Sequence, residues 1–463
     1  MRHLLLVLLL LILGHFLSVT DCLAADHNIF GLHLIQTADI NSVAPVINST
    51  GGDWGYITIV IRTDQFDYRT WQDFFDQCRR LHLVPIVRLA TILDGPNWQA
   101  PTLSDIDNLA DFLNTLNWPT TTQYVIPFNE PNHASEWGGG VDAADYANKF
   151  IYTALKLKSL NPNFFVLGPA LDLAAPDMAP DHLSAATFYQ QILTTDRQFF
   201  DRLDGLASHS YPNHGYIGKP TDRGQHSILG FLWEQSFIKN LGINKTYPVF
   251  ITETGWPHSE GQARTNTYYT ANTSAKFLIQ AISIWQKYPQ VKAITPFIYN
   301  YSAPPFDHFS WLDPTEKLYP AYQQVVNLPK VPNQPPQITS YRIDRLQFPF
   351  LIFANKQYST TLRLTNTGQS IWGEYPDSQF CLTPDPNPNI SVSSVCNSTS
   401  DLVLPGQSID IPFKFTITHN TKNLVLSWPN GPSYELTALS PSSSIYRPKT
   451  HLLDRLRSWI KGH

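Results

Sequence analysis

Two glutamates, Glu130 and Glu253, each follow an apolar run that predicts a buried β-strand. The first closes the segment YVIPFNE, and the second lies in PVFITETGWP. In a parallel α/β barrel the carboxyl ends of the strands form one face, so both carboxylates would lie on that face. Such a pair is the minimum for cleaving a glycosidic bond, with one carboxyl as acid/base and the other as nucleophile or base.

The elements that position this pair repeat along the chain from about residue 28 to residue 327. Short apolar runs, which predict strands, occur at 29–34, 56–61, 84–89, 124–128, 164–167, 205–208, 248–252 and 294–299. Amphipathic patterns, which predict helices, occur at 68–81, 103–116, 143–160, 185–200, 226–240 and 265–286. Alternating strands and helices of this number predict an α/β fold, a (β/α)8 TIM barrel over residues 26–327.

A change in pattern after residue 327 predicts a second domain. Residues 328–338 contain four prolines and predict a stiff linker. Beyond it, short alternating runs at 358–365, 408–415 and 423–428 predict a C-terminal β-sandwich over residues 339–440. Cys381 and Cys396 in this region could form a disulfide in an exported protein, while Cys78 is expected to be a buried core thiol.

The C-terminal region also resembles a known module. The segments LTNTGQSIW at 364–372 and LPGQSI at 404–409 resemble immunoglobulin-like accessory modules found beside bacterial glycosidases and in autophagy-receptor proteins. The resemblance implies an immunoglobulin-like sandwich. Its role is left open between binding carbohydrate and acting as a spacer.

The barrel resembles the glycoside hydrolases of clan A, whose acid/base follows an asparagine at the end of strand four and whose nucleophile ends strand seven. Asn129, Glu130 and Glu253 match that pattern in this sequence. The resemblance implies that Glu130 is the acid/base, Asn129 a neighbour that binds sugar, and Glu253 the nucleophile. The family within the clan stays open.

The resemblance implies three further polar residues. His209 and Tyr211, at the end of the predicted sixth strand, match the histidine and tyrosine of the family; His209 would bind substrate or hold a carboxylate, and Tyr211 would donate to Glu253. A cation is expected beside the nucleophile to keep it ionised. Arg62 follows the predicted strand at 56–61, Arg88 follows the apolar residues 84–87 near the end of the next strand, and Arg88 is favoured.

Aromatic residues beyond the predicted strand ends are candidates for stacking on sugar rings. They are Trp98, Trp137, Trp256 and Trp311, of which Trp256 is the strongest candidate. At the eighth strand, where many members of the clan place a tryptophan beneath the sugar, this chain has Tyr299.

Composition narrows the class of partner. A net charge of −5 and 15% charged residues give no basic surface for nucleic acid, whereas 13% aromatic residues suit carbohydrate. The chain has neither a CxxC nor an HExxH pattern, so neither a metal nor a cofactor is expected.

Both ends of the chain carry segments outside the predicted domains. Residues 1–25 combine Arg2 and His3, an apolar run and small residues at 24–25, which predicts a signal peptide, with an uncleaved N-terminal anchor as the alternative. Residues 441–463 are rich in Ser and Pro and then basic and amphipathic, which suits a membrane surface or a partner groove, although packing on the protein itself is favoured.

Together these features predict a retaining β-glycoside hydrolase, secreted or associated with the cell surface, acting on a polysaccharide or oligosaccharide. Two alternatives remain. The barrel could be a catalytically silent carbohydrate-binding protein, or it could be a transglycosylase that uses the same residues.

Overall fold

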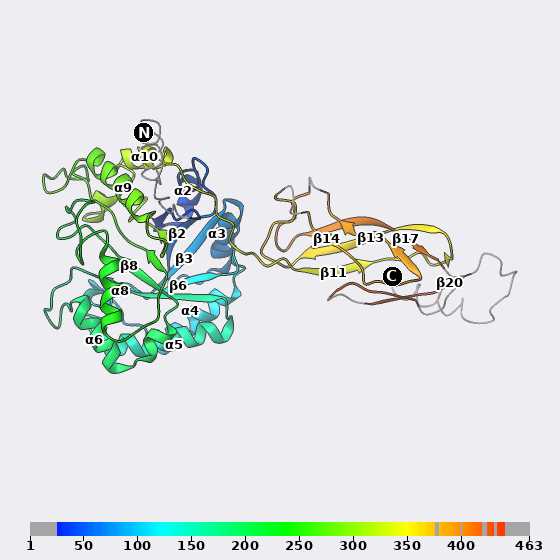
Figure 1. The fold of residues 1–463 in the computed structure, drawn as a ribbon, viewed down its shortest axis with the longest axis horizontal. Coiled ribbons are helices and arrows are strands. Elements are labelled where there is room, and N and C mark those ends of the chain that lie inside the picture. The colour runs from blue at the N-terminus through cyan, green and yellow to red at the C-terminus, as the bar shows by residue number, and fades with distance from the viewer. Residues whose placement is uncertain (1–25, 376–378, 399–400, 419–423, 430–432, 440–463) are drawn as a thin grey trace, which may run out of the picture. The chain divides into compact units, whose positions relative to one another are not determined.

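The computed structural model describes residues 26–375, 379–398, 401–418, 424–429 and 433–439 (Figure 1). The chain divides into two compact units, with the boundary between Pro336 and Gln337. The predicted signal peptide or anchor at 1–25 and the predicted amphipathic tail at 441–463 lie outside the described residues. Among the helices of the described residues, none is both long and apolar enough to cross a membrane.

The first unit is built on an eight-stranded parallel sheet. In sheet order its strands are β1 Gly31–Leu34, β2 Gly55–Arg62, β3 Leu83–Ala90, β6 Gln123–Pro127, β7 Phe164–Asp172, β8 Gly205–His209, β9 Val249–Ile251 and β10 Val291–Ile294. The first and last strands meet, because Phe30 and Ile294 form a parallel bridge and the Ile294 amide donates to the Ile29 carbonyl at 2.7 Å. The predicted TIM barrel is therefore confirmed.

Helices connect the strands and lie around them (Figure 1). They are α2 Ile40–Ile47, α3 Tyr68–Arg80, α4 Leu103–Thr115, α5 Ala143–Leu160, α6 Ala185–Thr195, α7 Gln198–Arg202, α8 Gly230–Asn240, α9 Ala271–Trp285 and α10 Pro320–Val326. Helix α3 shows why they form: Asp67 caps its first turn by accepting the Thr70 amide, and Trp71, Phe74 and Cys78 bury one face at helical spacing. Neither α2 nor α10 has a counterpart among the predicted helices, since both are short and α2 contains Pro45.

The eighth strand differs from its prediction. It covers Val291–Ile294, whereas the apolar run that predicts it starts at Ile294 and reaches Tyr299. Pro296 has no amide hydrogen and cannot donate to a sheet ladder, so the apolar pattern continues where the pairing stops. Tyr299 consequently lies five residues beyond the strand rather than at its end.

The inside of the barrel changes from apolar to polar along the strands. Its apolar part is a separate buried cluster made of Trp54, Tyr56, Val84, Ile86, Ile126, Leu167, Ala170, Ala207, Phe250 and Ala293. Side chains two residues apart on a strand face the same side, so Arg88 continues the inward series of Ile86, and His209 continues that of Ala207. The carboxyl ends of the strands therefore carry polar groups above a packed floor.

The second unit is all-β. A four-stranded antiparallel sheet contains β11 Tyr341–Leu346, β13 Gln357–Asn366, β17 Ser408–Ile417 and β15 Ile390–Val392, in that order. Short pairs complete it: β12 Ile352–Phe353 with β20 Ala438–Leu439, β14 Cys381–Leu382 with β16 Val395–Cys396, and β18 Leu424–Leu426 with β19 Tyr434–Leu436. Alternating burial along β17 gives the sheet one covered face and one open face, as expected for a sandwich. The immunoglobulin-like assignment stays a prediction.

The cysteines lie as expected from the sequence. Cys381 and Cys396 are opposite each other on β14 and β16 and form a disulfide. Cys78 is free and buried in the barrel unit.

The first part of the predicted proline-rich linker is bound to the barrel unit. The Asn333 amide donates to the Asp53 carbonyl at 3.1 Å, and the Thr121 amide donates to the Pro336 carbonyl at 2.8 Å. The buried Lys330 ammonium donates to Ser49 Oγ at 2.6 Å. The compact unit thus continues to Pro336 rather than ending at residue 327.

Candidate active site

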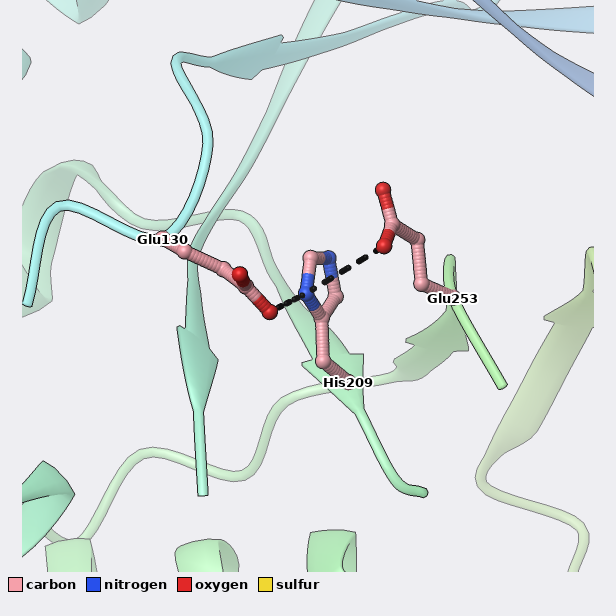
Figure 2. Close-up of side chains that lie close together, drawn as sticks. All are labelled: Glu130, His209 and Glu253. Atoms are coloured by element: carbon pink, nitrogen blue, oxygen red, sulfur yellow. Dashed lines mark hydrogen bonds and ion pairs between the residues drawn. The ribbon is translucent and has the colours of Figure 1, made fainter. Parts of the chain in front are cut away.

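Glu130 and Glu253 come together at one end of the barrel, although 123 residues of sequence separate them. Glu130 lies three residues beyond β6, and Glu253 lies two residues beyond β9. One carboxylate oxygen of each, and one ring nitrogen of His209, all lie within 4.8 Å of one another. Figure 2 shows the His209 ring between the two carboxylates.

Glu253 lies in a positive environment. It is 7% exposed, its Oε1 accepts from the Arg88 guanidinium at 2.7 Å, and its Oε2 accepts from the Tyr211 hydroxyl at 3.3 Å. Burial alone would raise the pKa of Glu253, but the charges of His209 and Arg88, with the Tyr211 hydrogen bond, outweigh it and hold the pKa below its ordinary value. Glu253 is therefore ionised near neutral pH and is placed to act as a nucleophile.

Only one of the two candidate arginines reaches the carboxylates. Arg88, near the end of β3, also donates to Asn129 Oδ1 at 2.5 Å, so one guanidinium contacts both Asn129 and Glu253. Arg62 instead forms a surface ion pair with Asp64 at 2.8 Å.

His209 bridges the two carboxylates. Its Nδ1 lies 2.7 Å from Glu130 Oε1 and 3.8 Å from Glu253 Oε2. Burial would lower the pKa of His209, but the negative charges of Glu253 and Glu130 outweigh it and raise the pKa above its ordinary value. Glu130 is the more accessible carboxyl, with 23% of its side chain exposed against 10% for Glu253.

The chain that carries Glu130 leaves its strand in a strained conformation. Phe128 and Glu130 have φ angles of 68° and 30°, and Ala170, which accepts the Glu130 amide at 3.0 Å, has a φ of 56°. Such values are uncommon outside glycine and occur often at functional sites. The side-chain amide of Asn132 holds the turn by donating to the Asp172 carbonyl at 2.9 Å.

His33 is a site residue that has no counterpart among the predicted ones. It lies on β1, is fully buried, and has its Nδ1 3.7 Å from Glu253 Oε1. Neither ring nitrogen has a hydrogen-bond partner among the described residues. Burial lowers the pKa of His33 to about 3, so the ring is neutral. A histidine within the apolar segment GLHL is the sequence signal that could have revealed it.

Glu136 is a second site residue without a predicted counterpart. It ends the short helix η2 (Ala134–Glu136) and lines a small pocket together with Arg88 and Asn129. Burial, reinforced by the charge of Glu130, raises the pKa of Glu136 to about 7. The site therefore holds three carboxyl groups rather than two.

Most of the aromatic residues predicted to stack on sugar rings have their ring faces covered by other parts of the protein. Trp137, Trp256, Trp311 and Tyr299 are 3%, 5%, 4% and 4% exposed. The Trp256 indole donates to the Gly218 carbonyl at 2.7 Å, and that of Trp137 donates to Asp145 at 3.0 Å. A stacking platform needs an uncovered ring face, and these rings pack inside the protein instead. Trp98, on the hairpin formed by β4 (Leu93–Asp94) and β5 (Asn97–Trp98), is only partly buried.

The same polar centre has the composition of a possible cation site. Within the described residues, Glu130, His209 and Glu253 form a group whose ligand atoms could surround a metal ion. The Arg88 guanidinium already binds Glu253 and would repel such an ion. The arrangement favours chemistry by the side chains themselves.

Fold and site together define a (β/α)8-barrel protein with a carboxylate pair at the carboxyl ends of its strands. No protein-family model matches the chain, and no curated protein matches it. Similar solved structures include a monomeric β-xylosidase from Caulobacter crescentus CB15, with 12% identity and a TM-score of 0.47 over 85% of this chain and 97% of that one. A family 39 glycoside hydrolase from Bacteroides cellulosilyticus WH2 gives 12% identity and a TM-score of 0.46, over 86% of this chain and 82% of that one. An endo-β-1,3-glucanase from Sorangium cellulosum gives 14% identity and a TM-score of 0.43, over 65% of this chain and 98% of that one.

Proposed function

We propose that this protein is a retaining β-glycoside hydrolase. The observation that carries the proposal is the pairing of an ionised Glu253, held by Arg88 and Tyr211, with an oxygen of Glu130 no more than 4.8 Å away. Retaining glycosidases have carboxyl groups about 5 to 5.5 Å apart, whereas inverting enzymes keep them about 6.5 to 9.5 Å apart to admit a water molecule. The close approach supports the retaining class.

The proposed reaction has two displacements. Glu253 attacks the anomeric carbon while Glu130 gives its proton to the departing glycosidic oxygen, which leaves as an alcohol. Glu130, now ionised, then takes a proton from water, whose oxygen attacks the same carbon and releases Glu253. The sugar leaves with its original anomeric configuration, and no electron transfer or cofactor is required.

The test is turnover of the purified chain on β-linked glucans, mannans, xylans and galactans and on matching aryl glycosides. Glu253→Gln should lower kcat by about 10³-fold or more with unchanged thermal unfolding, because it removes the nucleophile and keeps the shape. Glu316→Gln, the same change at an exposed position, is the matched control.

The anomer formed first, observed by proton NMR, should be the β-anomer. An α-anomer would contradict the retaining mechanism. Binding of a glycan without turnover on any substrate would instead favour a carbohydrate-binding protein.

We also propose that the protein is exported, since residues 1–25 resemble a signal peptide and a Cys381–Cys396 disulfide suits an oxidising compartment. Mass spectrometry of the mature chain from its natural host should show loss of the N-terminal segment and the intact disulfide. A full-length, reduced chain would contradict this proposal.

A further inference from the structure

A small polar pocket lies beside the catalytic pair, between the ends of β3 and β6. Arg88, Asn129 and Glu136 provide its polar groups, and Trp98 and Phe128 are among its apolar walls. It has room for about one water-sized group. Only part of a substrate, such as a single hydroxyl, therefore fits.

The polar groups of this pocket are arranged to meet a group that both donates and accepts hydrogen bonds. Arg88 Nε is buried and has no hydrogen-bond partner among the described residues, so a donor is left over. Glu136 supplies a carboxyl acceptor on the same lining. A hydroxyl satisfies both at once, because its oxygen accepts and its hydrogen is donated.

The pocket is held in a fixed shape by its surroundings. The Gly138 amide, which follows η2, donates to the Trp98 carbonyl at 2.8 Å, and Thr91 Oγ1 donates to the Gln99 carbonyl at 2.5 Å. These bonds fasten the β4–β5 hairpin to both η2 and the end of β3. Asn129 Oδ1 accepts from Arg88 at 2.5 Å, which holds the Arg88 side chain against the Asn129 side of the pocket.

The position of the pocket identifies which sugar it would meet. Arg88 lines the pocket and also binds Glu253 at 2.7 Å, so the pocket lies one side chain away from the nucleophile. A group held there belongs to the sugar ring whose anomeric carbon Glu253 attacks. We propose that Glu136 determines specificity by binding one hydroxyl of that sugar; this inference rests on the proposed glycosidase function.

The test pairs removal of Glu136 with removal of each hydroxyl in turn. The substrates are the aryl glycoside that the wild type turns over best and its monodeoxy analogues, and kcat/KM is measured for the wild type and Glu136→Gln. At one ring position, loss of the hydroxyl should cost the wild type about 10- to 100-fold, as for a hydrogen bond to a charged group. In Glu136→Gln the same loss should shrink to about 3-fold or less, whereas losses at the other positions should be equal in both proteins.

Asp94→Asn removes an exposed carboxyl from the tip of the same hairpin and should behave like the wild type. Glu136→Asp keeps a carboxyl group but shortens the side chain by one carbon, so its loss of kcat/KM at that ring position should lie between those of the wild type and Glu136→Gln. It replaces Glu136→Gln if that variant does not fold. Equal losses at every position in wild type and variant would overturn this inference while leaving the glycosidase intact. Absence of wild-type turnover would instead count against the proposed function itself.

Discussion

Glu130 and Glu253 have the same side chain and different surroundings, which is what allows them different roles. Glu253 accepts from Arg88 and Tyr211, whereas the ion pair that Glu130 makes among the described residues is with His209. A carboxylate held by donors is stabilised in its ionised form, and a more exposed carboxyl can exchange its proton with a substrate. These contacts support the proposed division between Glu253 as nucleophile and Glu130 as acid/base.

The proposed acid role of Glu130 predicts that the effect of its removal depends on the leaving group. Glu130→Ala should lower kcat/KM for unactivated glycosides by about 10²- to 10⁴-fold, because their leaving oxygen needs a proton. Aryl glycosides with acidic phenols need little protonation and should lose far less in the glycosylation step. Kinetics on a series of aryl glycosides of graded phenol pKa would check this. Equal losses across the series would contradict the assignment.

The cation beside Glu253 predicts a shift of the acid limb of the pH profile. The pKa of Glu253 is lowered in part by Arg88, so Arg88→Met should raise it and protonate the nucleophile at higher pH. The acid limb of kcat/KM should move upward by about one pH unit or more, along with a fall in rate. The matched control is Arg62→Met, which removes an arginine that pairs with Asp64 instead and should leave the limb in place.

Packing between β8, α6 and α8 supplies a further buried carboxyl, that of Glu234, next to the strand that carries His209. Glu234 on α8 is fully buried, accepts from Tyr189 on α6 at 2.9 Å and also accepts from Ser208 on β8. Ser208 precedes His209 in sequence, so this network supports the strand that carries the bridging histidine. Burial raises the pKa of Glu234 to about 7.

This shift predicts how stability varies with pH. A carboxyl whose pKa is raised from 4.5 to about 7 on folding contributes stability that is fully present below pH 4.5 and is lost as the pH rises through 7. The loss is on the order of 3 kcal/mol for a shift of this size. The temperature of thermal unfolding should therefore fall more steeply between pH 4.5 and 8 in the wild type than in Glu234→Gln. Parallel curves for the two proteins would rule out this contribution.

Most of the helices and strands could be predicted from the local pattern of apolar residues in the sequence. Helix α5 has the predicted bounds, and β2 and β3 differ from prediction by one residue at each end, because long apolar or amphipathic runs leave little choice of structure. Two of the differences have local causes, namely Pro45 inside α2 and an apolar segment that continues to Tyr299 although the pairing of β10 ends before Pro296.

At the scale of the whole molecule, the position of the boundary between the two units affects the stability of the barrel unit. Residues 328–336 return to the barrel unit through Lys330, Asn333 and Pro336, which bind Ser49, Asp53 and Thr121 in order along the chain. A proline-rich segment need not be a free linker when its carbonyls and neighbouring side chains find partners.

Two truncated chains would measure this contribution. A chain of residues 26–336 should unfold at least about 5 °C above a chain of residues 26–327, since the shorter one loses several hydrogen bonds and leaves barrel groups unpaired. Lys330→Met in the longer chain should reproduce part of the difference. Equal unfolding temperatures of the two truncated chains would show that residues 328–336 add nothing to the barrel.

Apolar periodicity along the chain was enough to predict eight strands, most of their helices and two glutamates at strand ends, because each of these depends on residues close in sequence. Contacts across the barrel could not be obtained in that way. Arg88 meets Glu253 across 165 residues of sequence, and the neutral His33, the third carboxyl of Glu136 and the covered faces of Trp137, Trp256 and Trp311 likewise depend on strand register and barrel closure. These are long-range properties, since shifting a strand by one residue would turn its inward side chains outward while leaving the local sequence unchanged.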